Sequence, residues 1–135
     1  MAKTFKVDII TPGNEPIHIE VESLQTGTSN GAVEFRANHT AIILSTIPAT
    51  TTIIKADGKK EKMFTSSGII YLKDNNLKFC CDAVEYSQDI DLSRAENAKE
   101  RAEKRLKENK DIDIERAKMA LARANARIQT FSIND

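Results

Sequence analysis

A chain of 135 residues has the length of one domain, or of a small domain with an appendage, which excludes a large multi-domain enzyme. Lys plus Arg number 20 and Asp plus Glu number 20, so the net charge is zero, without the basic excess expected of a nucleic-acid-binding protein. No apolar run approaches the ~20 residues of a membrane-spanning helix, and the first residues lack the apolar stretch of a secretion signal. We therefore expect a soluble cytosolic protein with no transmembrane segment and no nucleic-acid partner.

The two parts of the chain differ in composition. Residues 1–88 hold 19 charged side chains, all five glycines, all three prolines and six of the seven aromatic residues. Residues 89–135 hold 21 charged side chains in 47 positions, with no glycine or proline. Turn residues and aromatics favour short strands, whereas an alanine-rich, charged segment without chain breakers favours helices. We predict an α+β fold, with a β-sandwich domain over residues 1–88 and a helical hairpin regulatory domain over residues 89–135.

The first domain begins with two strands whose apolar and polar residues alternate. Residues 5–9 alternate in this way, and residues 17–22 do so again after a turn at residues 11–14. A turn-prone stretch at residues 26–31 then precedes two apolar segments, at residues 32–35 and 41–47.

Two hairpin signals complete this domain. Asp57-Gly58 and Asp74-Asn75-Asn76 each lie between two apolar segments. Roughly eight or more short strands at this spacing indicate an antiparallel β-sandwich, or flattened barrel. No helical segment separates the strands, which argues against a parallel α/β fold.

The second domain shows helical periodicity in two segments. Apolar residues recur at spacings of three and four in the first segment, at Leu92, Ala95, Ala98, Ala102 and Leu106. They recur in the same way in the second segment, at Ile114, Ala117, Leu121, Ala124, Ile128 and Phe131. The apolar stripe pauses at residues 108–111, so we predict an antiparallel two-helix hairpin connected there.

Each predicted helix has a candidate N-terminal cap. Ser93 and Glu96 have the spacing of a capping box in the first helix, with Asp89 and Asp91 as alternative caps, and Asp113 precedes the second helix. The seam between the helices is rich in alanine, which buries little apolar area at roughly 25 cal/mol per Å². We therefore expect the two helices to hold each other weakly and to form a two-state element.

Residues that would support catalysis are scarce. His18 alternates with core positions and is expected to face outward, and His39 is expected to be a hydrogen-bonding or interface residue. Cys80 and Cys81 should point to opposite faces of a strand, which suits neither a mutual disulfide nor a metal site. The chain has no Gly-rich phosphate loop and no Cys-x-x-Cys, so the sequence does not indicate an active site.

Four arginines in the predicted hairpin have spacings that align them in pairs along one face of each helix. Arg94 and Arg101 are two helical turns apart, and Arg123 and Arg127 are one turn apart. In an antiparallel hairpin these guanidinium groups could converge and hold a polyphosphate, with Asp91 positioning the Arg94 side chain. The alternative is a solvated helix face on which arginines align by chance.

Five segments spread along the chain resemble one protein family. They are VDIITP at residues 7–12, Gly31 with NHTA at 38–41, SGIIYL at 67–72, AVE at 83–85 and IDLSRA at 90–95. Together they are similar to the epsilon subunits of bacterial F-type ATP synthases over essentially the whole chain. The last segment matches the Ile/Leu-Asp-x-x-Arg-Ala motif of members that bind ATP.

The resemblance implies a non-catalytic central-stalk subunit, peripheral at the cytoplasmic face of the cell membrane. Its sandwich would bind the gamma subunit and the membrane c-subunit ring and couple their rotation during hydrogen-ion transport and ATP synthesis. Its hairpin would inhibit ATP hydrolysis when it extends toward the catalytic alpha and beta subunits.

The resemblance also implies a regulatory ATP site. The motif supplies Ile90, Asp91, Arg94 and Ala95. Further residues are Glu85 for the adenine amino group and Arg101, Arg123 and Arg127 for the phosphates. ATP would be sensed rather than hydrolysed and would favour the folded hairpin; Mg²⁺ could accompany it but is not required by the sequence.

Two alternatives belong to other classes of protein. One is a free-standing cytosolic ATP sensor without a rotary partner. The other is a phosphoryl-transfer enzyme that uses the arginines, against which the lack of a base, metal ligands and a phosphate loop argues.

Overall fold

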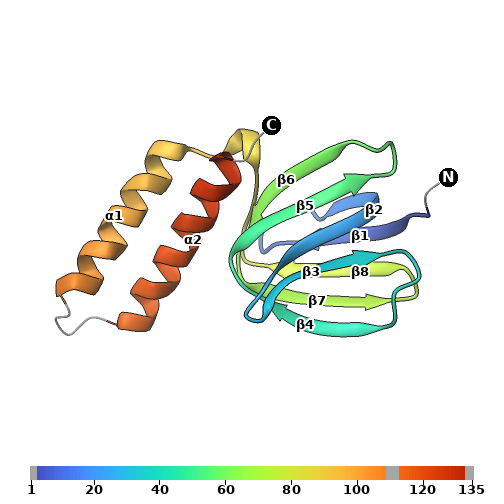
Figure 1. Ribbon diagram of the computed structural model, residues 1–135, viewed down its shortest axis with the longest axis horizontal. Coiled ribbons are helices and arrows are strands. Elements are labelled where there is room, and N and C mark those ends of the chain that lie inside the picture. Colours follow the sequence, from blue (N-terminus) through green and yellow to red (C-terminus); the bar gives the residue numbers. More distant parts are fainter. Residues whose placement is uncertain (1–2, 109–112, 133–135) are drawn as a thin grey trace.

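The computed structural model describes residues 3–108 and 113–132, which form a β-sheet domain followed by two helices (Figure 1). The strands are β1 (Phe5–Ile10), β2 (Ile17–Thr28), β3 (Gly31–Arg36), β4 (Ile42–Thr46), β5 (Ala49–Lys55), β6 (Lys60–Thr65), β7 (Gly68–Lys73), β8 (Asn76–Cys81) and β9 (Val84–Tyr86). A 3-10 turn, η1 (Ser87–Asp89), leads into α1 (Leu92–Glu108) and α2 (Ile114–Ser132). The predicted α+β fold, a β-sandwich domain followed by a helical hairpin, is confirmed.

The strands form one sheet around the larger of two apolar clusters. Their order is β4-β7-β8-β1-β2-β5-β6-β9, with β3 paired to β2. All pairs are antiparallel except β1 with β8, which are parallel. A tight turn forces its two strands to run antiparallel, whereas strands as distant in sequence as β1 and β8 are free of that constraint.

The predicted alternation places one face of each strand in the core. Phe5, Val7 and Ile9 of β1 are buried, as are Leu77 and Phe79 of β8. We call the following set the main core: Phe5, Val7, Ile9, Val21, Leu24, Phe35, Ile53, Met63, Ile70, Leu72, Leu77, Phe79 and Cys81. Because all its members lie between residues 5 and 81, the helices do not contribute to it.

The prediction of a turn-prone stretch at residues 26–31 was wrong for its first half. Strand β2 continues to Thr28, because Thr26 is buried and its Oγ1 lies 2.8 Å from Oγ1 of Thr51. Gly27 is also in the strand, where it pairs with Ala32 of β3. Its lack of a side chain allows β5 to approach, since a Cβ there would lie 3.0 Å from the Cβ of Ala49. The turn is limited to Ser29 and Asn30. Both predicted hairpins form, and Asp74 and Asn75 have the positive φ angles, 52° and 61°, of a type I′ turn.

The helices begin at aspartates. The Arg94 backbone amide donates to Asp91 Oδ1 at 3.1 Å, so Asp91 rather than Ser93 or Asp89 is the cap of α1. The Arg116 amide donates to Asp113 Oδ1 at the same distance, as predicted for α2. Of the predicted connection, residue 108 still belongs to α1, and residues 109–111 lie outside the described residues.

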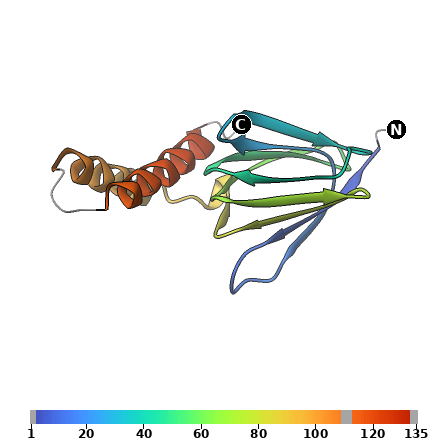
Figure 2. The same ribbon diagram turned by 90° about the horizontal axis from the view of Figure 1, so that it is seen from below.

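Helix α2 has two buried faces, of which the helical spacing of apolar residues predicted only one. Ala117 and Ala124 lie in the predicted alanine seam against α1, where Ala95 and Ala102 are also buried. The predicted stripe was wrong at its ends, because Ile114 and Phe131 are 41% and 37% exposed. Instead, Ala126 and Thr130 are buried against β5, β6 and η1. Helix α2 thus lies between α1 and the sheet, and Figure 2 shows both helices to one side of the strands.

The adjacent cysteines lie on opposite faces of β8, as predicted: Cys80 is exposed and Cys81 is buried. Burial raises the pKa of the Cys81 thiol to about 11, so at pH 8 almost none of it is the reactive thiolate. Titration of the native protein with a chromogenic disulfide reagent at pH 8 should therefore modify Cys80 quickly and Cys81 only after denaturation. Rapid modification of two thiols in the native protein would contradict this placement.

Candidate functional site

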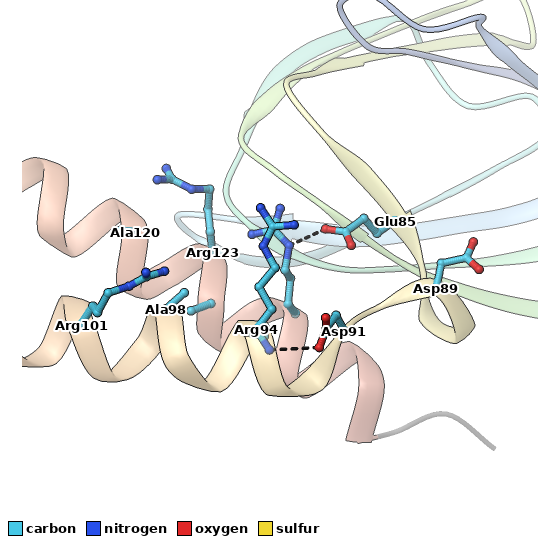
Figure 3. Close-up of a pocket in the computed structure, with 11 residues that line it drawn as sticks. Glu85, Asp89, Asp91, Arg94, Ala98, Arg101, Ala120 and Arg123 are labelled. Carbon is cyan, nitrogen blue, oxygen red and sulfur yellow. Dashed lines mark hydrogen bonds and ion pairs between the residues drawn. The ribbon is translucent and has the colours of Figure 1, made fainter.

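A cavity of about 340 Å³ lies where the start of α1, the second half of α2 and the β9–η1 segment meet (Figure 3). Both helices and the β domain contribute side chains to it. The lining residues are Glu85, Asp89, Asp91, Arg94, Ala95, Ala98, Arg101, Ala120, Arg123, Ala124 and Arg127.

The four spaced arginines all line this cavity. Arg94 and Arg101 extend from α1, and Arg123 extends from α2 (Figure 3), where Arg127 follows one turn later. Guanidinium groups are permanently charged and carry forked N–H donors, so a set of them suits the oxygens of a phosphate chain. The structure therefore brings together the arginines that the hairpin arrangement was expected to bring together.

Small side chains keep the space between the helices open. Ala95 and Ala98 of α1 face the cavity together with Ala120 and Ala124 of α2. Larger residues at these four positions would bury more area between the helices, but they would fill the cavity. The weak alanine seam and the cavity are therefore two consequences of the same residues.

Arg127 makes the most specific contacts at the site. Its Nε donates to Glu85 Oε1 at 2.5 Å, and its guanidinium carbon lies 4.2 Å from the centroid of the Phe64 ring. Both members of the ion pair are about one-third exposed or less, so water screens the pair less than it would at the surface. Phe64 was not among the predicted site residues. The available signal was the pair Met63-Phe64, because two consecutive apolar residues in an alternating strand cannot both face one core.

Two predicted site residues have different positions or roles from those expected. Asp91 was expected to hold the Arg94 side chain, but its Oδ1 accepts the Arg94 backbone amide, because this position caps the helix. Ile90 does not line the cavity; it is 6% exposed and packs with Phe64 and Ala126. Its side chain therefore contributes to the packing of α2 on the β domain.

The cavity carries mixed charge. Four arginines face three carboxylates, Glu85, Asp89 and Asp91, of which Asp89 was not among the predicted site residues. Among residues 3–108 and 113–132, no group of three or more His, Cys, Asp or Glu side chains is arranged to hold a metal ion. The two histidines lie elsewhere: His18 faces outward as predicted, with Nδ1 2.6 Å from Asp8 Oδ1, and His39 Nδ1 lies 2.7 Å from the Thr40 carbonyl.

No helix in the described part of the chain combines the length and apolar character needed to cross a bilayer.

Comparison with known proteins identifies the family. Residues 4–87 match the beta-sandwich domain of the ATP synthase delta/epsilon chain, and residues 88–132 match its long alpha-helix domain. The ATP synthase epsilon chain of Clostridium acetobutylicum is 42% identical over 107 residues, which cover 79% of this chain and 80% of that one. The epsilon chain of Clostridium novyi is 42% identical over 106 residues, covering 78% and 81%.

Two solved structures share the fold. One is a chain of the OSCP/F1/c-ring part of the Euglena gracilis mitochondrial ATP synthase, with a TM-score of 0.79, 16% identity and coverage of 91% of this chain and 78% of that one. The other is a chain of the central stalk/c-ring of the Tetrahymena thermophila mitochondrial ATP synthase, with a TM-score of 0.63, 12% identity and coverage of 96% and 95%. The family matches and the clostridial relatives together show that this chain belongs to the ATP synthase delta/epsilon family, as an epsilon chain.

Proposed function

We propose that this chain is a non-catalytic central-stalk subunit whose hairpin senses ATP and inhibits ATP hydrolysis by the enzyme. In this role the β domain binds the gamma subunit and the membrane c-subunit ring, and the complex holds it peripherally at the cytoplasmic face of the membrane. The extended hairpin contacts the catalytic alpha and beta subunits. The relatives are epsilon chains, and the structural neighbours come from complexes that contain a central stalk or a c ring.

The observation that carries the nucleotide part of this proposal is the arginine-lined cavity between the helices. Arg94, Arg101, Arg123 and Arg127 are assigned to the phosphates. Glu85 keeps its second oxygen, Oε2, for the adenine amino group, and the small Ala95 leaves room for the base. No residue is assigned as a base toward the γ-phosphate, so ATP is bound and released unchanged.

A ligand in this cavity favours the folded hairpin. The arginines belong to the helices, but Glu85 and Asp89 come from the β9–η1 segment. When the hairpin leaves the β domain, the ligand loses the contacts that this segment supplies. A ligand shifts an equilibrium by its difference in affinity between the two states, so ATP stabilises the docked state.

An exposed apolar patch supports the assignment of a protein partner to the β domain. Ile43 is 66% exposed, Ile69 51% and Tyr71 46%, and Ile43 lies opposite Tyr71 on the neighbouring strand. Apolar side chains that are exposed next to one another on a surface are typical of protein contacts. We assign this patch to the gamma subunit.

Calorimetric titration of the isolated chain with ATP tests the nucleotide part of the proposal. Saturable binding of one ATP is expected in the presence of EDTA, with no release of inorganic phosphate during prolonged incubation. Heats no larger than those of dilution would rule out the site, and phosphate release would favour an enzyme.

A further inference from the structure

One row of residues across the β domain makes hydrogen-bond, ion-pair and cation–π contacts with α2. In the sheet register Thr50 of β5 lies opposite Phe64 of β6, and Phe64 lies opposite Glu85 of β9. Residues opposite each other on neighbouring strands point to the same side of the sheet. We call Thr50, Phe64 and Glu85 the docking row, because all three contact α2 through Thr130 or Arg127.

Phe64 is buried by residues outside the main core, among them Ala126 of the docked hairpin. Its neighbour Met63 belongs to the main core, so strand alternation directs Phe64 to the opposite side of β6. The ring is nevertheless 0% exposed, because it packs with Ile90 and with Ala126 of α2 in a separate small cluster. If α2 moved away, the ring would lose the cover of Ala126 and become more exposed, and Arg127 would lose its contact with the ring.

Phe64 and Glu85 together determine where the Arg127 guanidinium lies. The ring faces one side of the guanidinium at 4.2 Å, and the carboxylate accepts from its Nε. A cation over an aromatic ring is attracted to the face of the ring. The attraction is stronger where the pair is shielded from water, as it is at this buried ring. Arg127 lines the cavity but Phe64 does not, so the ring can affect a bound ligand only through its contact with the arginine.

We propose that Phe64 is a positioning residue for the nucleotide site, which orients Arg127 toward the cavity only while α2 is docked. This inference rests on the proposed function, because it assigns the route by which ATP binding and hairpin docking influence each other. All four cavity arginines belong to the hairpin. Among the described residues, Arg127 contacts the docking row and the other three do not. Arg127 therefore adds to the coupling that Glu85 and Asp89 supply directly, and its partners on the β domain are Phe64 and Glu85.

The test is a double-mutant cycle on ATP affinity, with Phe64→Leu, Arg127→Gln and the combination of both. Leu retains apolar burial but lacks the aromatic face, so Phe64→Leu should weaken ATP binding by about three- to tenfold. In the Arg127→Gln background the same change should have little further effect, because Phe64 acts through the guanidinium. A loss that remains the same in both backgrounds would overturn the proposal.

Phe79→Leu is the matched control, because it makes the same change to a ring of the main core. It should lower the stability of the β domain to denaturant while leaving ATP affinity unchanged. Hydrogen exchange of α2 without nucleotide supplies a second readout and should be faster in Phe64→Leu than in Phe79→Leu. If the unmodified chain does not bind ATP, the proposed function fails and the coupling with it. If it binds and Phe64→Leu binds equally well, only the positioning role is overturned.

Discussion

Arg94→Ala and Arg127→Ala should each weaken ATP binding to the isolated chain by about ten- to a hundredfold. Hydrogen bonds between charged partners contribute about 1.5–3 kcal/mol each, and every 1.4 kcal/mol corresponds to about a tenfold change in affinity. The two arginines come from different helices and line the same cavity, so each should show the effect independently. Calorimetric titration of the three proteins measures the dissociation constants directly.

The two variants should differ in a second property. Arg127 also pairs with Glu85 and lies over Phe64, whereas no contact of the Arg94 side chain with the β domain is found in the described residues. Arg127→Ala should therefore loosen the docked hairpin even without nucleotide, which hydrogen exchange of α2 would detect. Arg94→Ala should leave that exchange unchanged.

Arg105→Ala is the matched control for Arg94→Ala. Arg105 lies on α1 like Arg94 and is exposed, but it does not line the cavity. Its replacement removes one positive charge from the same helix and should change ATP affinity by less than about twofold, since exposed charges act weakly through water. Equal losses in Arg105→Ala and Arg94→Ala would indicate a general charge effect, and unchanged affinity in Arg94→Ala and Arg127→Ala would refute the assignment.

Local patterns predicted the elements of the fold well, because each depends on near neighbours in sequence. The alternation in residues 5–9 places Phe5, Val7 and Ile9 in the core, and Asp113 caps its helix as expected. The parallel pairing of β1 with β8 could not be predicted from such local patterns, because no turn joins the two strands. The length of β2 was also underestimated, because Thr26 and Gly27 resemble turn residues and owe their place to contacts with β5.

The cavity was predictable in part, because helical spacing is also a local pattern. Helical spacing aligns Arg94 with Arg101 and Arg123 with Arg127, and an antiparallel hairpin then places the two pairs on one side. The docking of α2 was not predictable in this way, because it depends on which outer face of the β domain the helix covers. Ala126 and Thr130 look like ordinary helix residues, and Phe64 looks like one more core residue of its strand.

The contact between Thr130 of α2 and Thr50 of β5 offers a place for an engineered disulfide that would hold the hairpin in its docked position. Thr130 Oγ1 donates to the Ala126 carbonyl at 2.7 Å and lies 2.7 Å from Thr50 Oγ1. A hydroxyl has one hydrogen, so Thr50 is the donor in the contact between the two side chains. In a disulfide the two β-carbons are about 3.5–4.5 Å apart. Hydroxyl oxygens 2.7 Å apart bring their β-carbons close to that separation. Cysteines at these two positions should therefore form a disulfide between α2 and β5.

The oxidised T50C/T130C chain should no longer inhibit ATP hydrolysis when it is assembled with gamma and the alpha and beta catalytic subunits. A Cys80→Ser background removes the exposed thiol, and Cys81 is buried and protonated at neutral pH. With the disulfide formed, α2 stays on the β domain and the hairpin does not extend toward the catalytic subunits. Reduction should restore inhibition in the same sample, and the steady-state rate of ATP hydrolysis before and after reduction is the measurement.

A chain ending at residue 88 gives the reference rate for this experiment. Its β domain should stay folded, because the main core lies entirely within residues 5–81, and its complex should hydrolyse ATP as fast as the oxidised one. The single variants T50C and T130C should show no change on oxidation, which separates the cross-link from the loss of the Thr50–Thr130 hydrogen bond. If the oxidised double variant inhibited hydrolysis as strongly as the reduced one, inhibition would not require release of α2 from the β domain. The docking row would then stabilise the fold without controlling the enzyme.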